Sequence, residues 1–170
     1  ICTLLAISPT LMGDVFYVDI DAPTGGDGLS WKTAFVDLQD GFDAAMALEG
    51  PDEVWIAEGI YHPTYQVEEG NPRAVTFLPG GEVSIYGGFE GWESDTSQRD
   101  WEFNPVVLSG DLNGDDLPGW QNMEENCYLI VVLDSGEELL NAFAYYGTVI
   151  FDGLTITGGF NNEWTSELLV

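Results

Sequence analysis

The sequence predicts an all-β solenoid with a single capping helix, and three observations favour this fold class. First, 45% of the 170 residues are hydrophobic and 13% aromatic, which is too apolar for a disordered chain. Second, the 21 glycines and 8 prolines are spread evenly, as in short strands joined by tight turns. Third, strand-like runs return roughly every 22 residues, a wider spacing than in a β-sandwich.

Residues 1–13 are uncharged and largely apolar, and Asp14 is the first charged residue of the chain. The segment is too short to span a bilayer and predicts the remnant of a secretory signal peptide. A buried first strand is the alternative. Residues 14–170 are then expected to form an N-terminal cap and the first coils, truncated at the C-terminus because no cap follows Thr157.

The first strand is expected at 15–19 and is followed by a turn-rich segment at 21–28. The next segment changes period and predicts a helix near residues 36–48, ended by Gly50 and Pro51. Gly41 in its middle costs about 1 kcal/mol relative to Ala, so tertiary packing must hold the helix. Such a helix would cover the apolar end of a solenoid. The helical face is expected to carry Phe35, Leu38, Phe42, Ala45 and Met46.

Beyond the helix the pattern alternates between strand and turn. The predicted strands are rich in Val, Ile and Leu, and Gly or Pro separates several of them. They lie at residues 54–57, 75–78, 83–86, 106–109, 129–132, 149–151 and 154–157.

Seven sequence blocks occur in a consistent order, at residues 17–19, 30–35, 52–63, 85–93, 99–100, 107–111 and 151–159. Together they resemble the N-terminal part of bacterial secreted right-handed parallel β-helix proteins. The resemblance covers roughly residues 15 to 160 and implies the pectate-lyase-like superhelix, often with a C-terminal surface anchor. The shared blocks imply architecture and not a catalytic centre.

The charge balance excludes two classes of partner. Three Lys and Arg residues against 30 Asp and Glu residues give a net charge of -27. Nucleic acids and anionic membrane surfaces are bound chiefly through Lys and Arg, so neither is an expected partner. The acidity predicts either a solubilising surface or sites for divalent cations, which prefer carboxylate oxygens.

The run from Asp111 to Asp116 has the strongest metal-binding pattern. Asp111, Asn113 and Asp115 offer oxygen atoms at alternate positions of a tight loop, and Asp116 follows them. A helical calcium hand is not expected, because Asp116 and Asn122 stand where that motif has Gly and Glu. Two interpretations remain: a calcium site between coils with these four residues as ligands, or a solvated acidic turn.

Cys127 is the single cysteine if the first 13 residues are removed, and it is expected to be a buried thiol at a strand end. His62 precedes Pro63 and has no predicted catalytic partner. A lyase of this shape needs an arginine or lysine base, and only Lys32, Arg73 and Arg99 are present. No catalytic residue is therefore assigned.

Trp92, Trp101 and Trp120 lie in expected loops, where an aromatic ring either stacks on a sugar or packs the loop against a coil. We predict a non-enzymatic secreted or cell-surface scaffold, adhesin-like, that contacts an extracellular polysaccharide or cell-surface glycan through these rings. The alternative is a polysaccharide lyase or glycoside hydrolase whose catalytic coils lie beyond residue 170. The oligomeric state is left open.

Overall fold

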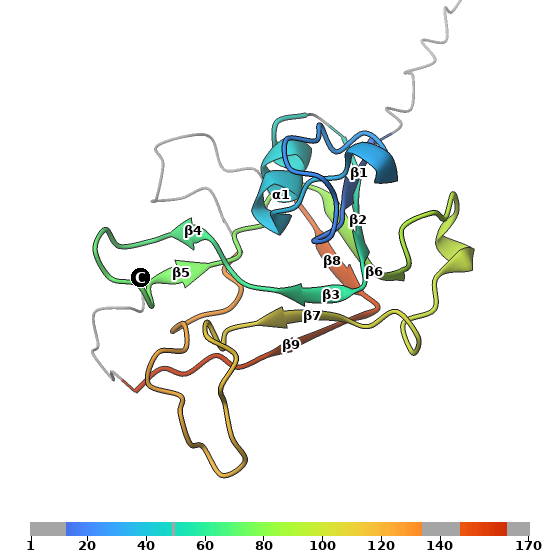
Figure 1. The fold of residues 1–170 in the computed structure, drawn as a ribbon. Helices are drawn as coiled ribbons and strands as arrows, with labels where there is room; N and C mark the ends of the chain where they lie inside the picture. Colours follow the sequence, from blue (N-terminus) through green and yellow to red (C-terminus); the bar gives the residue numbers. More distant parts are fainter. Residues whose placement is uncertain (1–12, 49, 134–146, 163–170) are drawn as a thin grey trace, which may run out of the picture.

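The computed structural model describes residues 13–48, 50–133 and 147–162 of the chain (Figure 1). The fold is mostly β-sheet with parallel strands, and one α-helix is present in these ranges. The prediction of an all-β class is confirmed at this level. The predicted signal-peptide segment, apart from Gly13, lies outside the described residues.

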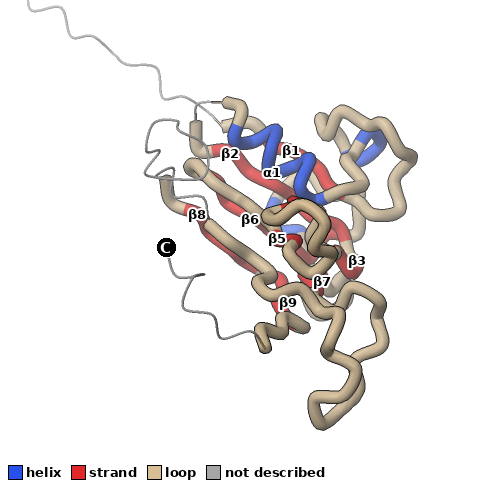
Figure 2. Tube along the Cα trace, turned by 90° about the vertical axis from the view of Figure 1, so that its left-hand side faces the viewer, coloured by secondary structure: helices blue, strands red, loops and turns tan. Residues whose placement is uncertain are grey.

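Two parallel sheets form the body of the protein. The larger sheet contains four strands and the smaller sheet three, and every pair within them is parallel. Figure 2 shows the strands of the larger sheet side by side. In spatial order the larger sheet is β1 (Val15–Val18), β2 (Asp52–Ala57), β6 (Val83–Phe89) and β8 (Val149–Asp152). The smaller sheet is β3 (Gly59–Tyr61), β7 (Val106–Ser109) and β9 (Leu154–Thr157).

The chain passes from the larger sheet to the smaller sheet three times, as β2 to β3, β6 to β7 and β8 to β9. A third line of contact joins Phe77 to Val131 in a parallel bridge. Here the Phe77 N–H donates to the Ile130 carbonyl at 2.8 Å, and the Val132 N–H donates to the Phe77 carbonyl at 2.9 Å. Phe77 follows β5 (Val75–Thr76), which pairs antiparallel with the short strand β4 (Tyr65–Gln66).

The core lies between these elements. The parallel register aligns Phe16, Val54, Ile85 and Phe151 across the four strands of the larger sheet. The first three are buried, and Phe151 packs against the same cluster while remaining partly exposed. Full burial of one such side chain is favourable by about 1.5–3 kcal/mol, so the three buried members of this column stabilise the fold.

The predicted helix is confirmed as α1 (Leu38–Met46), which packs on β1 and β2 at one end of the larger sheet (Figure 1). The carboxylate of the N-cap Asp37 accepts a hydrogen bond from the Gln39 N–H at 2.9 Å. Leu38, Phe42 and Ala45 form its buried face. Gly41 is required because the helix lies very close to the Val18 side chain.

Two sequence predictions need correction. The segment 129–132 is not a strand, since only Val131 takes part in an isolated bridge. The spacing of roughly 22 residues also does not describe the strand pairing, because Asp52 pairs with Val83 and Val83 with Val149. Val54, Val75 and Val106 belong to three different sheets, so the spacing between these strand-like runs measures the passage between sheets and not the return to the same sheet.

The Gly41→Ala variant tests the close approach of α1 to the sheet. A Cβ atom at this position would lie 2.7 Å from Val18 Cγ2 and 3.4 Å from Val54 Cγ1. We expect the overlap to outweigh the gain in helix propensity, with a net loss of about 1 kcal/mol of unfolding free energy measured by urea titration. In a Val18→Ala background the penalty should vanish. A more stable Gly41→Ala single variant would contradict the packing.

Candidate functional site

The loop that follows β7 gathers three carboxylates. One oxygen each from Asp111, Asp115 and Glu125 lie within 4.8 Å of one another. This spacing allows one divalent cation to contact all three side chains. Asp115 is exposed, whereas Asp111 and Glu125 are partly buried.

Asp111 also shapes the loop itself. Its Oδ1 accepts hydrogen bonds from the N–H groups of Gly114 at 2.8 Å and Asp115 at 3.2 Å. Its Oδ2 accepts from the Asp116 N–H at 3.1 Å. These bonds fold the backbone around the carboxylate and bring Asp115 to the same side.

Of the four residues predicted as calcium ligands, Asp111 and Asp115 belong to the three-carboxylate group, whereas Asp116 does not. Asn113 carries an amide oxygen in the same loop. Asn113 Oδ1 accepts from the Asp115 N–H at 3.3 Å, and Asp116 Oδ2 accepts from Asn126 Nδ2 at 2.9 Å. Glu125 is the third member of the group. The carboxylates that follow the motif in the sequence were the available signal for it.

Several oxygen atoms near this loop are buried without a hydrogen-bond partner among the described residues. They are Glu125 Oε1, Asp116 Oδ1 and Asn126 Oδ1. Asn126 is fully buried, and its Nδ2 also donates to the Gly158 carbonyl at 2.6 Å. Buried oxygen atoms normally have a donor or a cation beside them, so this side of the loop retains free ligand capacity.

Arg73 holds the segment around Asn126 in place, and we call its contacts the first clamp. Its Nε donates to the Asn126 carbonyl at 2.7 Å, and Nη2 donates to the Phe160 carbonyl at 2.6 Å. Nη1 donates to Asn162 Oδ1 at 3.1 Å, and the guanidinium carbon lies 4.3 Å from the centre of the Tyr128 ring. All three nitrogen atoms of the side chain are thus engaged in structural contacts.

Cys127 follows Asn126, whose carbonyl accepts a hydrogen bond from Arg73. The thiol is buried, as predicted, although the residue is not in a strand. Burial raises the pKa of the thiol to about 11, against a smaller opposing effect of the Arg73 charge. The thiol is therefore protonated at neutral pH, which does not suit a nucleophile.

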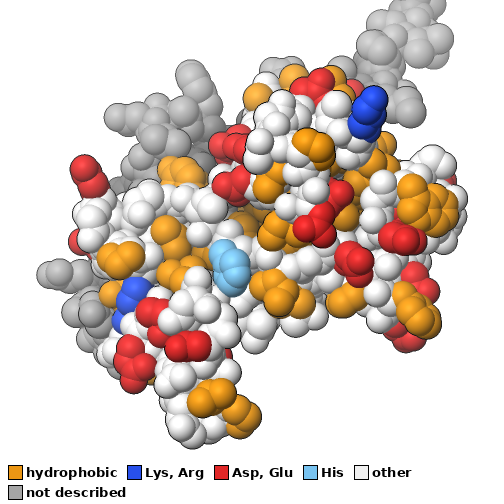
Figure 3. Space-filling model, viewed as in Figure 1, with side chains coloured by type: hydrophobic (Ala, Val, Ile, Leu, Met, Phe, Trp, Pro, Cys, Tyr) orange, Lys and Arg blue, Asp and Glu red, His pale blue; other side chains and the backbone are white. Residues whose placement is uncertain are grey.

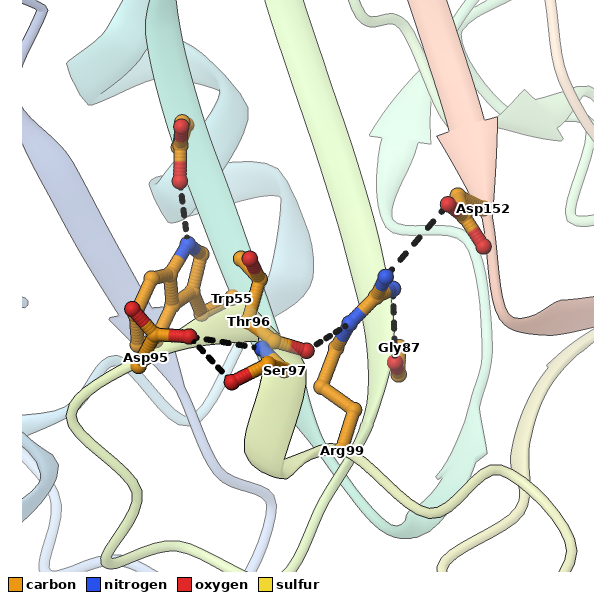
Figure 4. A network of polar contacts seen from close by, with 8 residues as sticks. Trp55, Gly87, Asp95, Thr96, Ser97, Arg99 and Asp152 are labelled. Atoms are coloured by element: carbon orange, nitrogen blue, oxygen red, sulfur yellow. Dashed lines mark hydrogen bonds and ion pairs between the residues drawn. The ribbon is translucent and has the colours of Figure 1, made fainter.

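Arg99 forms a second clamp, on the loop between β6 and β7 (Figure 4). Its Nε donates to the Thr96 carbonyl at 2.9 Å, and Nη1 donates to the Gly87 carbonyl at 3.4 Å. Nη2 lies 3.4 Å from Asp152 Oδ2 in an ion pair. The guanidinium carbon also lies 4.8 Å from the centre of the Tyr86 ring. Arg99 thereby ties its loop to both β6 and β8.

Glu93 organises the other end of the same loop. Its carboxylate accepts from the N–H groups of Glu90 at 2.7 Å, and of Gly91 and Trp92 at 3.0 Å each. Burial favours a higher pKa, but the backbone N–H groups of this turn outweigh it and hold the pKa of Glu93 below its ordinary value. The carboxylate thus stays charged and fixes the backbone that carries Trp92.

The three tryptophans predicted to face sugars are exposed. The exposed fractions are 62% for Trp92, 56% for Trp101 and 81% for Trp120. Trp92 and Trp101 lie in the loop between β6 and β7. Trp120 lies within the loop that carries the three carboxylates (the acidic loop), between Asp115 and Glu125, and has a positive φ of 63°. By contrast, Trp55 is buried and stacks on Phe89 with ring centres 4.7 Å apart.

Comparisons with family models, with curated proteins and with solved structures give no match. No helix in the described part of the chain has the length and apolar character needed to cross a membrane. The function proposed for this chain therefore rests on its own residues.

The Arg99→Met variant tests the second clamp. We expect it to lower the unfolding free energy by about 1–3 kcal/mol, because it leaves polar partners of a charged donor without their bonds. Lys32→Met is the matched control: it removes the same charge from an exposed side chain and should change stability by less than about 0.5 kcal/mol. Equal losses for the two variants in urea titrations would show that net charge, and not the clamp, is responsible.

Proposed function

We propose that this chain forms the cap and coils of a right-handed parallel β-helix and serves as a non-enzymatic secreted scaffold at the cell surface. The observation that carries the proposal is the repeated passage of the chain between two parallel sheets. In each of these two sheets, a new strand pairs with the strand that joined the same sheet before it, so the spatial order follows the sequence order. Crossovers between parallel strands are right-handed in nearly all proteins, which supports the proposed hand.

The third line of contact supports the same architecture. In a three-sided coil the chain forms a strand on each side before it returns, and the bridge from Phe77 to Val131 supplies pairing on a third side. The helix α1 packs on β1 and β2, where a cap would protect apolar surface. Export is supported by the uncharged apolar segment at 1–13.

A structural role is favoured over proton abstraction by the state of the two arginines. Arg73 and Arg99 donate to main-chain carbonyls through side-chain nitrogens and also lie against aromatic rings. A lyase base must instead be free to meet its substrate. Lys32 is the remaining basic residue. It is exposed on the short 3-10 helix η1 (Trp31–Thr33), which carries no buried residue.

The exposed rings of Trp92, Trp101 and Trp120 suit contact with glycans, because a sugar ring packs its apolar face on an aromatic ring. The net charge of -27 repels anionic polysaccharides. Neutral extracellular or cell-surface glycans are therefore the proposed partners.

Calcium is the proposed ion for the acidic loop. Asp111, Asp115 and Glu125 offer oxygen ligands, and the unpartnered Glu125 Oε1 adds support. The ion would neutralise repulsion between the three carboxylates and hold the loop against the buried Asn126, which bonds to Gly158 after β9. Its role would be structural.

Calcium should raise the melting temperature of the chain, by on the order of 5 °C at saturation. Asp115→Asn combined with Glu125→Gln should abolish the rise while sparing the loop-shaping bonds of Asp111. Glu124→Gln is the matched control, since it removes a neighbouring exposed carboxylate outside the group. Scanning calorimetry with calcium and with a chelator makes the measurement. An unchanged melting temperature in the parent would refute the ion site.

The glycan proposal is tested by affinity electrophoresis through gels containing xylan, mannan, soluble starch or a soluble cellulose derivative without charge. At least one of these polysaccharides should retard the parent protein. Each of the variants Trp92→Ala, Trp101→Ala and Trp120→Ala should weaken binding to that polysaccharide by about tenfold. Leu29→Ala, which trims another exposed apolar side chain, should leave retardation unchanged. Retardation by none of the gels, or release of reducing ends from a polysaccharide, would contradict a non-enzymatic glycan-binding scaffold.

A further inference from the structure

An open cavity of about 680 Å³ lies beside α1, and its lining residues include none from the acidic loop and none of the three exposed tryptophans. Its size is within the range of sites that bind small molecules. Three parts of the chain form it: the loop after β1, the helix α1 with the residues before it, and the end of β3 with the segment that follows it. Figure 3 shows acidic and hydrophobic side chains gathered near the imidazole on this face.

The floor of the cavity is apolar. Ile20, Phe35, Leu38 and Tyr61 are among its lining residues. The Tyr61 hydroxyl donates to the Ala57 carbonyl at 3.0 Å and accepts from the Ile20 N–H at 3.2 Å. These bonds fix the ring, and burial raises the pKa of Tyr61, so the phenol remains neutral. The floor therefore offers a rigid uncharged surface.

One wall is acidic. Asp37, Asp40 and Asp43 follow one another about one helical turn apart and all line the cavity. Asp37 Oδ1 accepts from Thr64 Oγ1 at 3.1 Å, and Asp43 Oδ1 accepts from Gln39 Nε2 at 2.8 Å. The Asp40 carboxylate is exposed and makes no hydrogen bond to the described residues. No lysine or arginine is among the residues that line the cavity. The wall thus presents uncompensated negative charge.

The spacing of these carboxylates argues against a single metal ion. In the described ranges, Asp111, Asp115 and Glu125 are the group close enough to share an ion, and the cavity acids do not form such a group. A larger cation can contact acids that are farther apart and can also bury an apolar body on the floor. His62, the single histidine of the chain, lines the same space.

We propose that this cavity binds a small organic cation, an alkyl- or arylammonium, with its apolar body on Phe35 and Ile20 and its ammonium group toward Asp40 and Asp43. Charge complementarity selects the ammonium, which has three N–H donors for the carboxylate oxygens. The apolar floor selects against inorganic cations. The site is independent of the proposed glycan contacts, because it uses none of the same residues.

The test uses phenethylammonium and its neutral counterpart 2-phenylethanol as probes for the full chain. The ring proton signals of His62 report on the cavity directly by NMR at constant pH, since the chain has no other histidine. The amine should shift these signals saturably, and the alcohol should bind at least about tenfold more weakly. Asp40→Asn with Asp43→Asn should weaken amine binding by about tenfold or more.

Glu69→Gln is the matched control, because it removes an exposed carboxylate outside the cavity. It should bind the amine as the parent does, which separates local recognition from general attraction to an acidic protein. Circular dichroism confirms that each variant is folded, and the single Asp40→Asn variant replaces the pair if the double variant is not. Equal binding of amine and alcohol, no saturable shift, or equal binding by the parent and the Asp→Asn variant would overturn the proposal.

Discussion

Parallel register between β2, β6 and β8 is the constraint on which the rest of the structure depends. It places residues of like character in columns across the strands, so that Val54, Ile85 and Phe151 meet on the core side. On the alternate positions, Tyr17, Trp55, Tyr86 and Asp152 align in the same way. A slip of one residue would exchange the two sets and expose the apolar column.

The second column, which contains Tyr17, Trp55, Tyr86 and Asp152, explains how the loop between β6 and β7 is held. Tyr17 and Trp55 pack edge to face with ring centres 5.6 Å apart, and Phe89 stacks on Trp55. Arg99 lies over Tyr86 and reaches Asp152, so one side chain completes the column across β6 and β8. With its base held in this way, the loop can present Trp92 and Trp101 to solvent while the strands beneath remain packed.

Much of the fold could be predicted from local pattern, because α1 and most strands depend on side-chain period and turn residues. The register could not, since it depends on contacts such as that of Val83 with Val149, which are far apart in the chain. The segment 129–132 has a strand-like composition, yet only Val131 finds a bridge. Gly41 looked unfavourable for a helix, but its small size is what lets α1 approach Val18.

The candidate sites also differ in how far the sequence predicts them. Asp111 and Asp115 lie in one local motif and were predicted, whereas Glu125 lies farther along the chain and joins them only in the folded loop. The cavity beside α1 unites residues from three separate segments, so no sequence motif marks it. Local turns can be inferred from residue types, but a site assembled by tertiary contacts requires the packed chain.

The most direct test of the account is the strand register, measured by cross-strand NMR contacts between backbone protons. The account predicts contacts between Val54 and Ile85 and between Ile85 and Phe151, in the pattern of parallel strands. Antiparallel contacts between strands adjacent in the sequence, such as β2 with β3 or β8 with β9, would contradict it.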